Sequence, residues 1–279
     1  MLIERYELNL LVEDKADPFL RSPARGALMH GLLLNSVDTN ELHSSSGLRP
    51  FSQNLINCGE SQYIWTINLL HEVQAAPIKT WLETHPERLF VEHYQSHLSV
   101  LSLESKKKLS YEQLLADALS ELPPKYVSFE FLTPLIFKKA GVRAPWPYPE
   151  ARMIMQSVFA RWNQFSDLSK FEDEQIFEDV CQYVSPQFLK IHSQNVAMDG
   201  VMFAGTTGSA SFNIQKTELR QLMHLAGLYS EYCGVGAKTA MGLGAVRYRA
   251  GLLSRKSKTA SAEISVLEPD AQPNVCANN

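Results

Sequence analysis

A glycine-rich segment near the end of the chain is the most specific chemical feature of the sequence. Residues 234–244 contain four glycines and one charged side chain, namely Gly234, Gly236, Gly242, Gly244 and Lys238. Glycine carries no Cβ, so the backbone amides of such a loop can approach a phosphate group closely. The segment therefore predicts an anion-binding loop. The alternative is a helix C-cap followed by a flexible turn, for which two or three glycines suffice.

The familiar nucleotide-binding motifs do not fit this loop. The G-x-G-x-x-G pattern fails because position 239 is threonine, and the Walker pattern fails because no glycine directly precedes Lys238. Both motifs also require the order strand, loop, helix, whereas this loop is expected to follow a helix and precede a strand. A nucleotide-dependent enzyme is accordingly disfavoured.

Basic residues gather around the same loop, although the chain is mildly acidic with a formal net charge of −4. The segment 234–258 contains no Asp or Glu and carries Lys238, Arg247, Arg249, Arg255, Lys256 and Lys258. Arg247 and Arg249 lie two residues apart in a predicted strand, so both are expected on one face. Together with Lys238 they predict a lane of cations beside the loop, suited to an anionic ligand. Solvated surface arginines are the alternative.

Histidine is the side chain best suited to proton transfer near neutral pH, because its unperturbed pKa is about 6.5. His43 lies in the polar segment 40–47, where a side chain can meet a ligand; an exposed loop histidine without a function is the alternative. His30 lies in a predicted helix that is apolar on nearly all sides, so a buried, hydrogen-bonded histidine is the alternative there. His93 and His97 have the spacing of a metal pair, but no third ligand is indicated, so no metal site is predicted.

The elements that must position these residues have the order β-α-β-β-α-β in the first half of the chain. Residues 2–12 alternate between apolar and polar side chains, which predicts a strand with one buried face. Ser22 as N-cap and Pro23 at the first helical position predict a helix through residue 34. The later expected elements are strands at 50–56, 63–70 and about 91–103, and a short helix at 77–85. This is the ferredoxin-like order.

The second half repeats this order loosely, after a break at residues 121–125. The expected elements are strands at 126–132, within 184–212 and at 245–249, and helices at 150–165 and 217–232. We therefore predict an α+β fold with two ferredoxin-like domains in tandem. The predicted boundaries are an N-terminal domain at 1–122, a C-terminal domain with the glycine-rich loop at 123–250, and a disordered tail at 251–279.

Composition restricts the class of protein further. The 279 residues are 45% hydrophobic and 20% charged, which supplies a sizeable core and excludes wholesale disorder. No stretch reaches the ~18 uncharged apolar residues that a membrane span needs, and the N-terminal residues lack the apolar block of a signal peptide. The four cysteines lie far apart and predict neither a disulfide framework nor a zinc site. A soluble, cytoplasmic protein is expected.

Taken together, these features resemble the RAMP superfamily, in which a second ferredoxin-like repeat ends in a helix, a glycine-rich loop and a strand. Within it, the chain is similar to the CRISPR-associated endoribonucleases that cut precursor CRISPR RNA within its repeats. Other segments agree in their order along the chain: residues 25–30, 42–43, 48–52, 131–138, 149–152 and 160–163. The resemblance covers roughly residues 1–250, and the glycine-rich loop is its most specific motif.

The resemblance implies metal-independent cleavage without a cofactor, in which a ribose 2′-OH attacks the adjacent phosphate to give 2′,3′-cyclic phosphate and 5′-OH ends. It further implies that His43, His30 and Arg49 are catalytic. The histidines would transfer protons, and Arg49 would stabilise the charged transition state without exchanging protons itself. The implied RNA-binding residues are Gly234, Gly236, Lys238, Gly242, Gly244, Arg247 and Arg249.

The partner that the resemblance implies is CRISPR repeat RNA, with no membrane. Association with subunits of a CRISPR effector complex and a homodimer are left open. The main alternative function is a noncatalytic RAMP-fold subunit that binds guide RNA inside an effector complex. The presence of both His30 and His43 favours the endoribonuclease, because a subunit that does not cut RNA needs neither.

Overall fold

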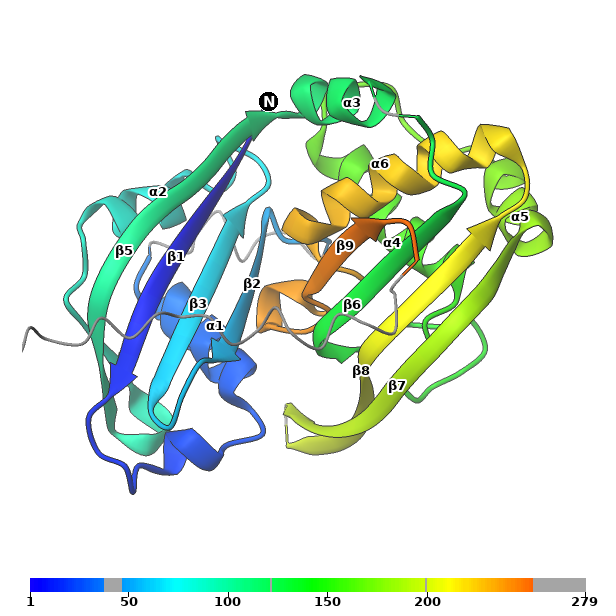
Figure 1. Ribbon diagram of the computed structural model, residues 1–279. Helices are drawn as coiled ribbons and strands as arrows, with labels where there is room; N and C mark the ends of the chain where they lie inside the picture. Colours follow the sequence, from blue (N-terminus) through cyan, green and yellow to red (C-terminus); the bar gives the residue numbers. More distant parts are fainter. Residues whose placement is uncertain (38–46, 121, 199, 253–279) are drawn as a thin grey trace, which may run out of the picture.

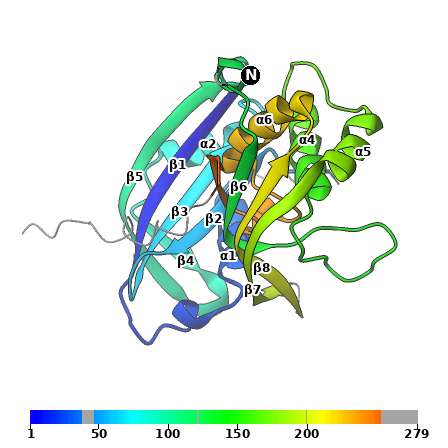
Figure 2. The same cartoon turned by 45° about the vertical axis from the view of Figure 1, so that its right-hand side comes forward.

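The computed structural model describes residues 1–37, 47–120, 122–198 and 200–252. Two antiparallel sheets lie side by side, and both views show this arrangement (Figures 1 and 2). The first sheet is built from the N-terminal half of the chain and the second from the C-terminal half. The strand β2 lies at the junction, where it contacts the glycine-rich loop.

The first sheet has the strand order β2-β3-β1-β5-β4. Its strands are β1 (Leu2–Val12), β2 (Phe51–Asn57), β3 (Gln62–Leu69), β4 (Arg88–Val91) and β5 (Ser96–Ser110), and its helices are α1 (Arg25–Asn35) and α2 (Ala76–Glu83). Without the short edge strand β4, this is the order of a ferredoxin-like sheet. The predicted alternation of β1 is confirmed, because Leu8 and Leu10 are fully buried while Asn9 between them is not.

The second sheet has the order β7-β8-β6-β9, which is the same ferredoxin-like arrangement. Its strands are β6 (Tyr126–Leu135), β7 (Val184–Met198), β8 (Val201–Ile214) and β9 (Val246–Ala250). Its helices are α4 (Ala151–Phe165), α5 (Glu174–Tyr183) and α6 (Thr217–Cys233). The predicted fold class, two ferredoxin-like folds in tandem, is confirmed. The exact division after residue 122 stays a prediction, and the tail after residue 252 lies outside the described residues.

An aromatic core joins the two halves through α3 (Tyr111–Ser120), which follows β5 and packs against α6. The hydroxyl of Tyr111 lies 2.9 Å from that of Tyr229, and Trp162 contacts both rings edge-on. All three side chains are almost fully buried. Large aromatic side chains bury much apolar area each, so this cluster fixes α6, and the loop that follows it, against the rest of the molecule.

The structure corrects the predicted start of the first helix. The helix begins at Arg25 and not at Pro23, and its N-cap is Ala24, which makes no side-chain cap. The hydroxyl of Ser22 accepts a hydrogen bond from the amide of Ala24 at 3.1 Å. The residues before Ser22 form a separate 3₁₀ helix, η1 (Pro18–Arg21). Ser22 therefore lies in the short turn between η1 and the first helix and is not the N-cap of that helix.

Three further elements differ from the expectation. The strand predicted at about 91–103 is two strands, β4 and β5, joined by η2 (Glu92–Tyr94) and by Gln95 in the left-handed conformation with φ 54°. The helices α3 and α5 were not predicted. The segment 171–180 is acidic, with five carboxylates and no basic residue. Asp173 caps the N-terminus of α5, and Glu174 and Glu178 pair with Arg152 of α4, so three of these carboxylates serve the helix and its packing.

Candidate active site

The glycine-rich loop, residues 234–244, follows α6 directly and packs tightly against neighbouring backbone. Gly236 has φ +83°, and a Cβ built there would lie 2.2 Å from the carbonyl oxygen of Ile136. Gly244 has φ +64°, and its Cβ would lie 1.9 Å from the carbonyl oxygen of Val235. Because only glycine tolerates both this backbone conformation and these contacts, the two residues let the loop fold back onto the protein.

The amides of the four glycines donate hydrogen bonds within the protein. Their acceptors lie 2.9–3.3 Å away and are Ser230 O for Gly234, Ser157 Oγ for Gly236, Thr239 O for Gly242 and Pro134 O for Gly244. All four glycines are buried. This arrangement differs from the expectation that their amides face a phosphate. RNA binding at these glycines stays a prediction, and the side chains that the loop carries are better placed to meet a ligand.

One side of the loop forms the wall of a cavity of about 390 Å³, which we call the basic pocket. Its lining comes from α1, α4, the segments before β2 and after β6, and the loop itself. The residues that matter here are His30, Arg49, Lys138, Arg161, Lys238 and Gly236. Segments far apart in the sequence thus converge on one cavity.

The charged residues among the described lining of the basic pocket are all basic. Its lining holds the basic residues Arg49, Lys138, Arg161 and Lys238, and none of the described lining residues is Asp or Glu. Cations that face one cavity raise its positive potential and attract anions. The pocket is therefore suited to a phosphodiester.

Two of the predicted catalytic residues, His30 and Arg49, both line the basic pocket. His30 is partly buried on α1, and its ring stacks on that of Phe51 with the centroids 5.9 Å apart and an interplanar angle of 22°. This stacking restricts the orientation of the imidazole beside the cavity. The third predicted catalytic residue, His43, lies outside the described residues.

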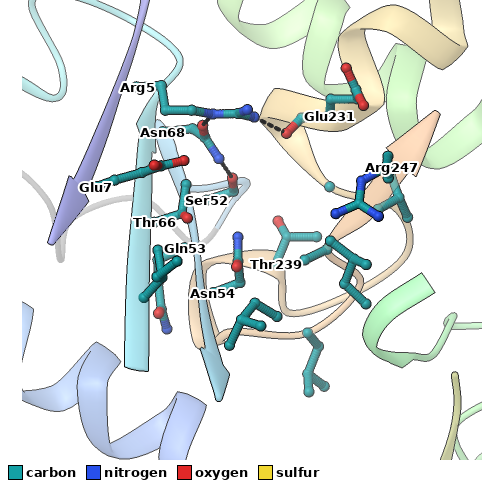
Figure 3. A pocket seen from close by; sticks show the side chains of 17 residues that line it. Arg5, Glu7, Ser52, Gln53, Asn54, Thr66, Asn68, Glu231, Thr239 and Arg247 are labelled. Atoms are coloured by element: carbon teal, nitrogen blue, oxygen red, sulfur yellow. Dashed lines mark hydrogen bonds between the residues drawn. The ribbon is translucent and has the colours of Figure 1, made fainter. Parts of the chain in front are cut away.

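A second cavity, of about 270 Å³, is called here the inter-sheet pocket because residues of both sheets line it (Figure 3). Its charges are mixed, since Arg5 and Arg247 line it together with Glu7 and Glu231. Thr239 lines both pockets. The 3₁₀ turn η3 (Thr239–Met241) of the glycine-rich loop therefore separates the two cavities.

In the inter-sheet pocket, Arg5 connects the first sheet to the end of α6 (Figure 3). Its Nε donates to Asn68 Oδ1 at 2.8 Å, and its Nη2 donates to the carbonyl of Glu231. Its guanidinium lies 4.7 Å from the centroid of the Tyr232 ring, and Ser52 Oγ donates to the Tyr232 carbonyl. A cation at a helix C-terminus interacts favourably with the last carbonyls, so Arg5 serves as a link between the two halves.

The predicted orientation of Arg247 and Arg249 is confirmed, because both are exposed in β9 while the residues between and before them are buried. Arg247 forms an ion pair with Glu130 at 2.9 Å. The predicted lane of cations is not formed, since Lys238 lines the basic pocket and Arg247 the inter-sheet pocket, with η3 between them. RNA binding by Lys238, Arg247 and Arg249 stays a prediction.

Two basic residues of the pocket are not among the predicted site residues. Lys138 follows β6, and Arg161 lies in α4 between the buried Val158 and Trp162. The sequence pattern that could have identified Arg161 is a charged residue among the apolar residues of one helix face. Such a residue must be paired, hydrogen-bonded or beside a cavity, because burying a charge without compensation is costly.

Neither a metal cluster nor a spanning helix emerges from the residues that the structure covers. In the described part of the chain, no three His, Cys, Asp or Glu side chains gather so that they could hold a metal ion. Over the same residues, no helix is both long and apolar enough to cross a membrane.

Comparison with known proteins gives consistent matches. A family model described as "CRISPR-associated endoribonuclease Cas6" matches residues 129–246. A Mycobacterium tuberculosis protein of the same description is 24% identical over 252 residues, which cover 88% of this chain and 78% of the relative. The Streptococcus thermophilus protein so described is 24% identical over 243 residues, covering 78% of this chain and 88% of the relative.

Solved structures match the fold over most of both chains. A Cas6 product complex has a TM-score of 0.70 at 22% identity and covers 89% of this chain and 100% of the other. A Thermus thermophilus Cas6 has a TM-score of 0.64 at 19% identity, with 89% and 98% covered. At this level of identity the likeness establishes the fold.

The two ferredoxin-like folds and the loop after the second long helix match the fold of solved structures that include an RAMP protein. The family model and both curated relatives carry the same description. The chain therefore resembles the Cas6 family of CRISPR-associated endoribonucleases.

Proposed function

We propose that this chain is an endoribonuclease that cuts precursor CRISPR RNA within its repeats, and that the cut is made at the basic pocket. The observation that carries the proposal is the convergence of His30 with four basic side chains on one cavity whose described lining has no carboxylate. A histidine supplies proton transfer near neutral pH, and the cations stabilise a phosphate that gains negative charge.

The proposed chemistry is a metal-independent transesterification. The ribose 2′-oxygen forms a bond to the adjacent phosphorus, and the bond from phosphorus to the 5′-oxygen breaks. One histidine takes the proton of the 2′-OH and another group donates a proton to the 5′-oxygen, and His30 and His43 are proposed for these two roles. The products are a 2′,3′-cyclic phosphate and a 5′-OH.

The cations have a different task in this proposal. Arg49 lines the same pocket as His30, and because a guanidinium group is a permanent cation, Arg49 is proposed to stabilise the charge of the phosphorane. Lys138 is exposed and Lys238 partly buried, and both are proposed to hold the RNA backbone near the cut.

The proposed partner is CRISPR repeat RNA, and the proposed place of action is the cytoplasm. Structures matched by this chain include a Cas6 product complex and a Cas6 substrate mimic complex.

Homodimer formation and association with effector subunits are separate predictions, which size-exclusion chromatography with and without RNA would test. A subunit that only binds guide RNA is not favoured, because such a protein needs no histidine in a basic pocket.

The proposal is tested with a labelled repeat RNA in which the nucleotide 5′ of the cut carries 2′-deoxyribose. This RNA should bind normally and resist cleavage, since it lacks the nucleophile. A matched RNA with the deoxyribose one nucleotide further away should be cut at the normal rate. Cleavage of both RNAs at equal rates would contradict the proposed chemistry, and failure to cut any repeat RNA would contradict the function.

A further inference from the structure

Arg161 is a buried cation whose side-chain hydrogen bonds to described residues both go to main-chain carbonyls. Its side chain is 5% exposed, although it lines the basic pocket. Its two terminal nitrogens donate to the carbonyl of Ser157 at 2.7 Å and to the carbonyl of Gly236 at 2.8 Å. No carboxylate in the described part of the chain forms an ion pair with it. Burial lowers the pKa of the guanidinium, but an arginine remains protonated at neutral pH.

Ser157, one turn earlier in α4, binds the amide group of Gly236, whose carbonyl group is bound by Arg161. Its hydroxyl accepts a hydrogen bond from the amide of Gly236 at 3.0 Å. The next amide of the loop, that of Ala237, donates to the carbonyl of Ile136 at 2.7 Å. Gly236 is therefore fixed through both its N–H and its C=O by two side chains of α4, and it cannot shift without breaking one of these bonds.

The held glycine lies two residues before Lys238, whose backbone is in an unfavourable conformation. Lys238 has φ +61°, in the left-handed region that residues with a side chain rarely adopt. Such a conformation persists only where the surrounding structure imposes it. After Lys238 the chain turns at once into η3, which is closed by the amide of Met241 donating to the Lys238 carbonyl at 2.9 Å.

We propose that Arg161, together with Ser157, is a positioning residue: by holding Gly236 it imposes the left-handed conformation of Lys238 and so keeps the Lys238 side chain at the basic pocket. The inference rests on the proposed function, in which Lys238 holds an RNA phosphate. Arg161 acts through Lys238 and makes no contact with RNA of its own. A lysine at position 161 has one ammonium group and would serve this role only in part, because it cannot present two parallel donors in a fixed plane.

The test is a double-mutant cycle on RNA binding, which isolates the coupling between two residues. The affinity for a repeat RNA that cannot be cut is measured against salt concentration for wild type, Arg161→Met, Lys238→Ala and the double variant. For single-stranded RNA, one lost phosphate contact reduces the slope of log affinity against log salt by ~0.7. Each single variant should lose about this amount, and the double variant should lose the same ~0.7 and no more.

Additive losses in the double variant would overturn the proposal, because Arg161 would then contribute a phosphate contact of its own. An Arg161→Met slope equal to that of wild type would also overturn it. Arg161→Lys should lie between wild type and Arg161→Met. A purely structural role predicts a lower melting temperature with an unchanged slope for the folded fraction.

Ser157→Ala keeps the test decisive if Arg161→Met does not fold, since it removes a single hydroxyl. It should lower the slope in the wild-type background and leave it unchanged in the Lys238→Ala background. The same experiment separates this proposal from the proposed function. A wild-type chain that binds repeat RNA without cutting it contradicts the function alone, whereas one that does not bind repeat RNA contradicts both.

Discussion

The two cavities on either side of η3 differ in the charges of their described lining residues. In the inter-sheet pocket, Arg5 donates to Asn68 and to the end of α6, and Arg247 is paired with Glu130. In the basic pocket, four basic side chains share a lining in which no described residue is acidic. Arg5 is held by acceptors of both halves and links them, whereas an exposed ion pair such as Arg247–Glu130 adds little stability. Several cations in one lining raise the positive potential of a cavity and attract an anion.

This difference separates two functions that the sequence presents together. Basic residues follow the glycine-rich loop closely in the chain, so their spacing alone suggests one binding surface. In the structure, η3 directs Lys238 to one cavity and leaves Arg247 at the other. We therefore expect substitutions in the basic pocket to change RNA cleavage and substitution of Arg5, which links the two halves, to change stability.

The largest effect is expected for His30→Ala. If His30 transfers a proton in the reaction, single-turnover cleavage should fall by ~10²–10⁴-fold, the range for one acid–base group, with RNA affinity nearly unchanged. Asn54→Ala in the inter-sheet pocket is the matched control and should cut at the wild-type rate. If His30 is only a structural neighbour of Phe51, the melting temperature should fall while cleavage per folded molecule holds, and the catalytic assignment would then be abandoned.

An effect of the same order is expected for His43→Ala, which concerns a residue outside the described part of the chain. Cleavage should fall by ~10²–10⁴-fold at saturating protein, because a second proton-transfer group is lost. Affinity for repeat RNA, measured by filter binding, should change little. Cleavage within about threefold of wild type would remove His43 from the mechanism, and equal losses of binding and cleavage would make it an RNA contact.

A smaller effect is expected when one arginine of each cavity is replaced. Arg49→Ala should slow cleavage by about 10²-fold, near the lower end of the cost of removing one donor to a developing oxyanion. Arg247→Ala should change the cleavage rate by less than about threefold, because Arg247 is already paired with Glu130. Equal decreases in cleavage rate for Arg49→Ala and Arg247→Ala at saturating protein would contradict the proposed difference between the two pockets.

The smallest effect is expected for a paired charge in the core of the first sheet. Burial raises the pKa of Glu4, but hydrogen bonds from Lys79 and Tyr6 outweigh it, so the pKa lies below its ordinary value. Because the pKa is lower in the folded state, this stabilisation is present above the ordinary carboxyl pKa and is lost as the pH falls through the folded value. Glu4→Gln should lower the melting temperature at pH 7 by about 2–4 °C, the shift that roughly 1 kcal/mol produces in a large domain.

The same variant checks the sign of that argument. The difference in melting temperature between wild type and Glu4→Gln should shrink as the pH falls from the ordinary carboxyl pKa through the lower pKa of the folded state, below which the carboxyl group is protonated in both states. Cleavage per folded molecule should not change at pH 7. A difference that grows at low pH would contradict the proposed stabilisation.

Local sequence patterns predicted those parts of the fold that are determined by residues close together in the chain. The alternation of β1 follows directly from burial of one sheet face, and the end of α6 at Cys233 follows from the glycine beside it. The break between β4 and β5 was missed because Gln95 adopts a left-handed conformation that its residue type does not indicate. The helix α5 was missed because its acidic residues are typical of a solvated loop, although Arg152 pairs with two of them.

The sequence predicted a site residue only where the local pattern around that residue indicated its role. His30 and Arg49 were identified and both line the basic pocket. The role of Arg161 depends on a contact with Gly236, 75 positions away in the chain, and no local pattern encodes that contact. The separation of Lys238 from Arg247 likewise depends on the geometry of η3. Side-chain direction across a turn cannot be deduced from spacing, in contrast to a strand.

The central claim, that the basic pocket carries out metal-independent cleavage of repeat RNA, is tested most directly by one measurement. Purified protein is incubated with a 5′-labelled repeat RNA in excess EDTA, and the ends of the products are analysed on a gel before and after treatment that opens cyclic phosphates. We predict cleavage at one position within the repeat at an undiminished rate, with a 2′,3′-cyclic phosphate on the upstream product and a 5′-OH on the downstream product. Cleavage that stops in EDTA and returns with Mg²⁺, or products with 5′-phosphate ends, would contradict the claim.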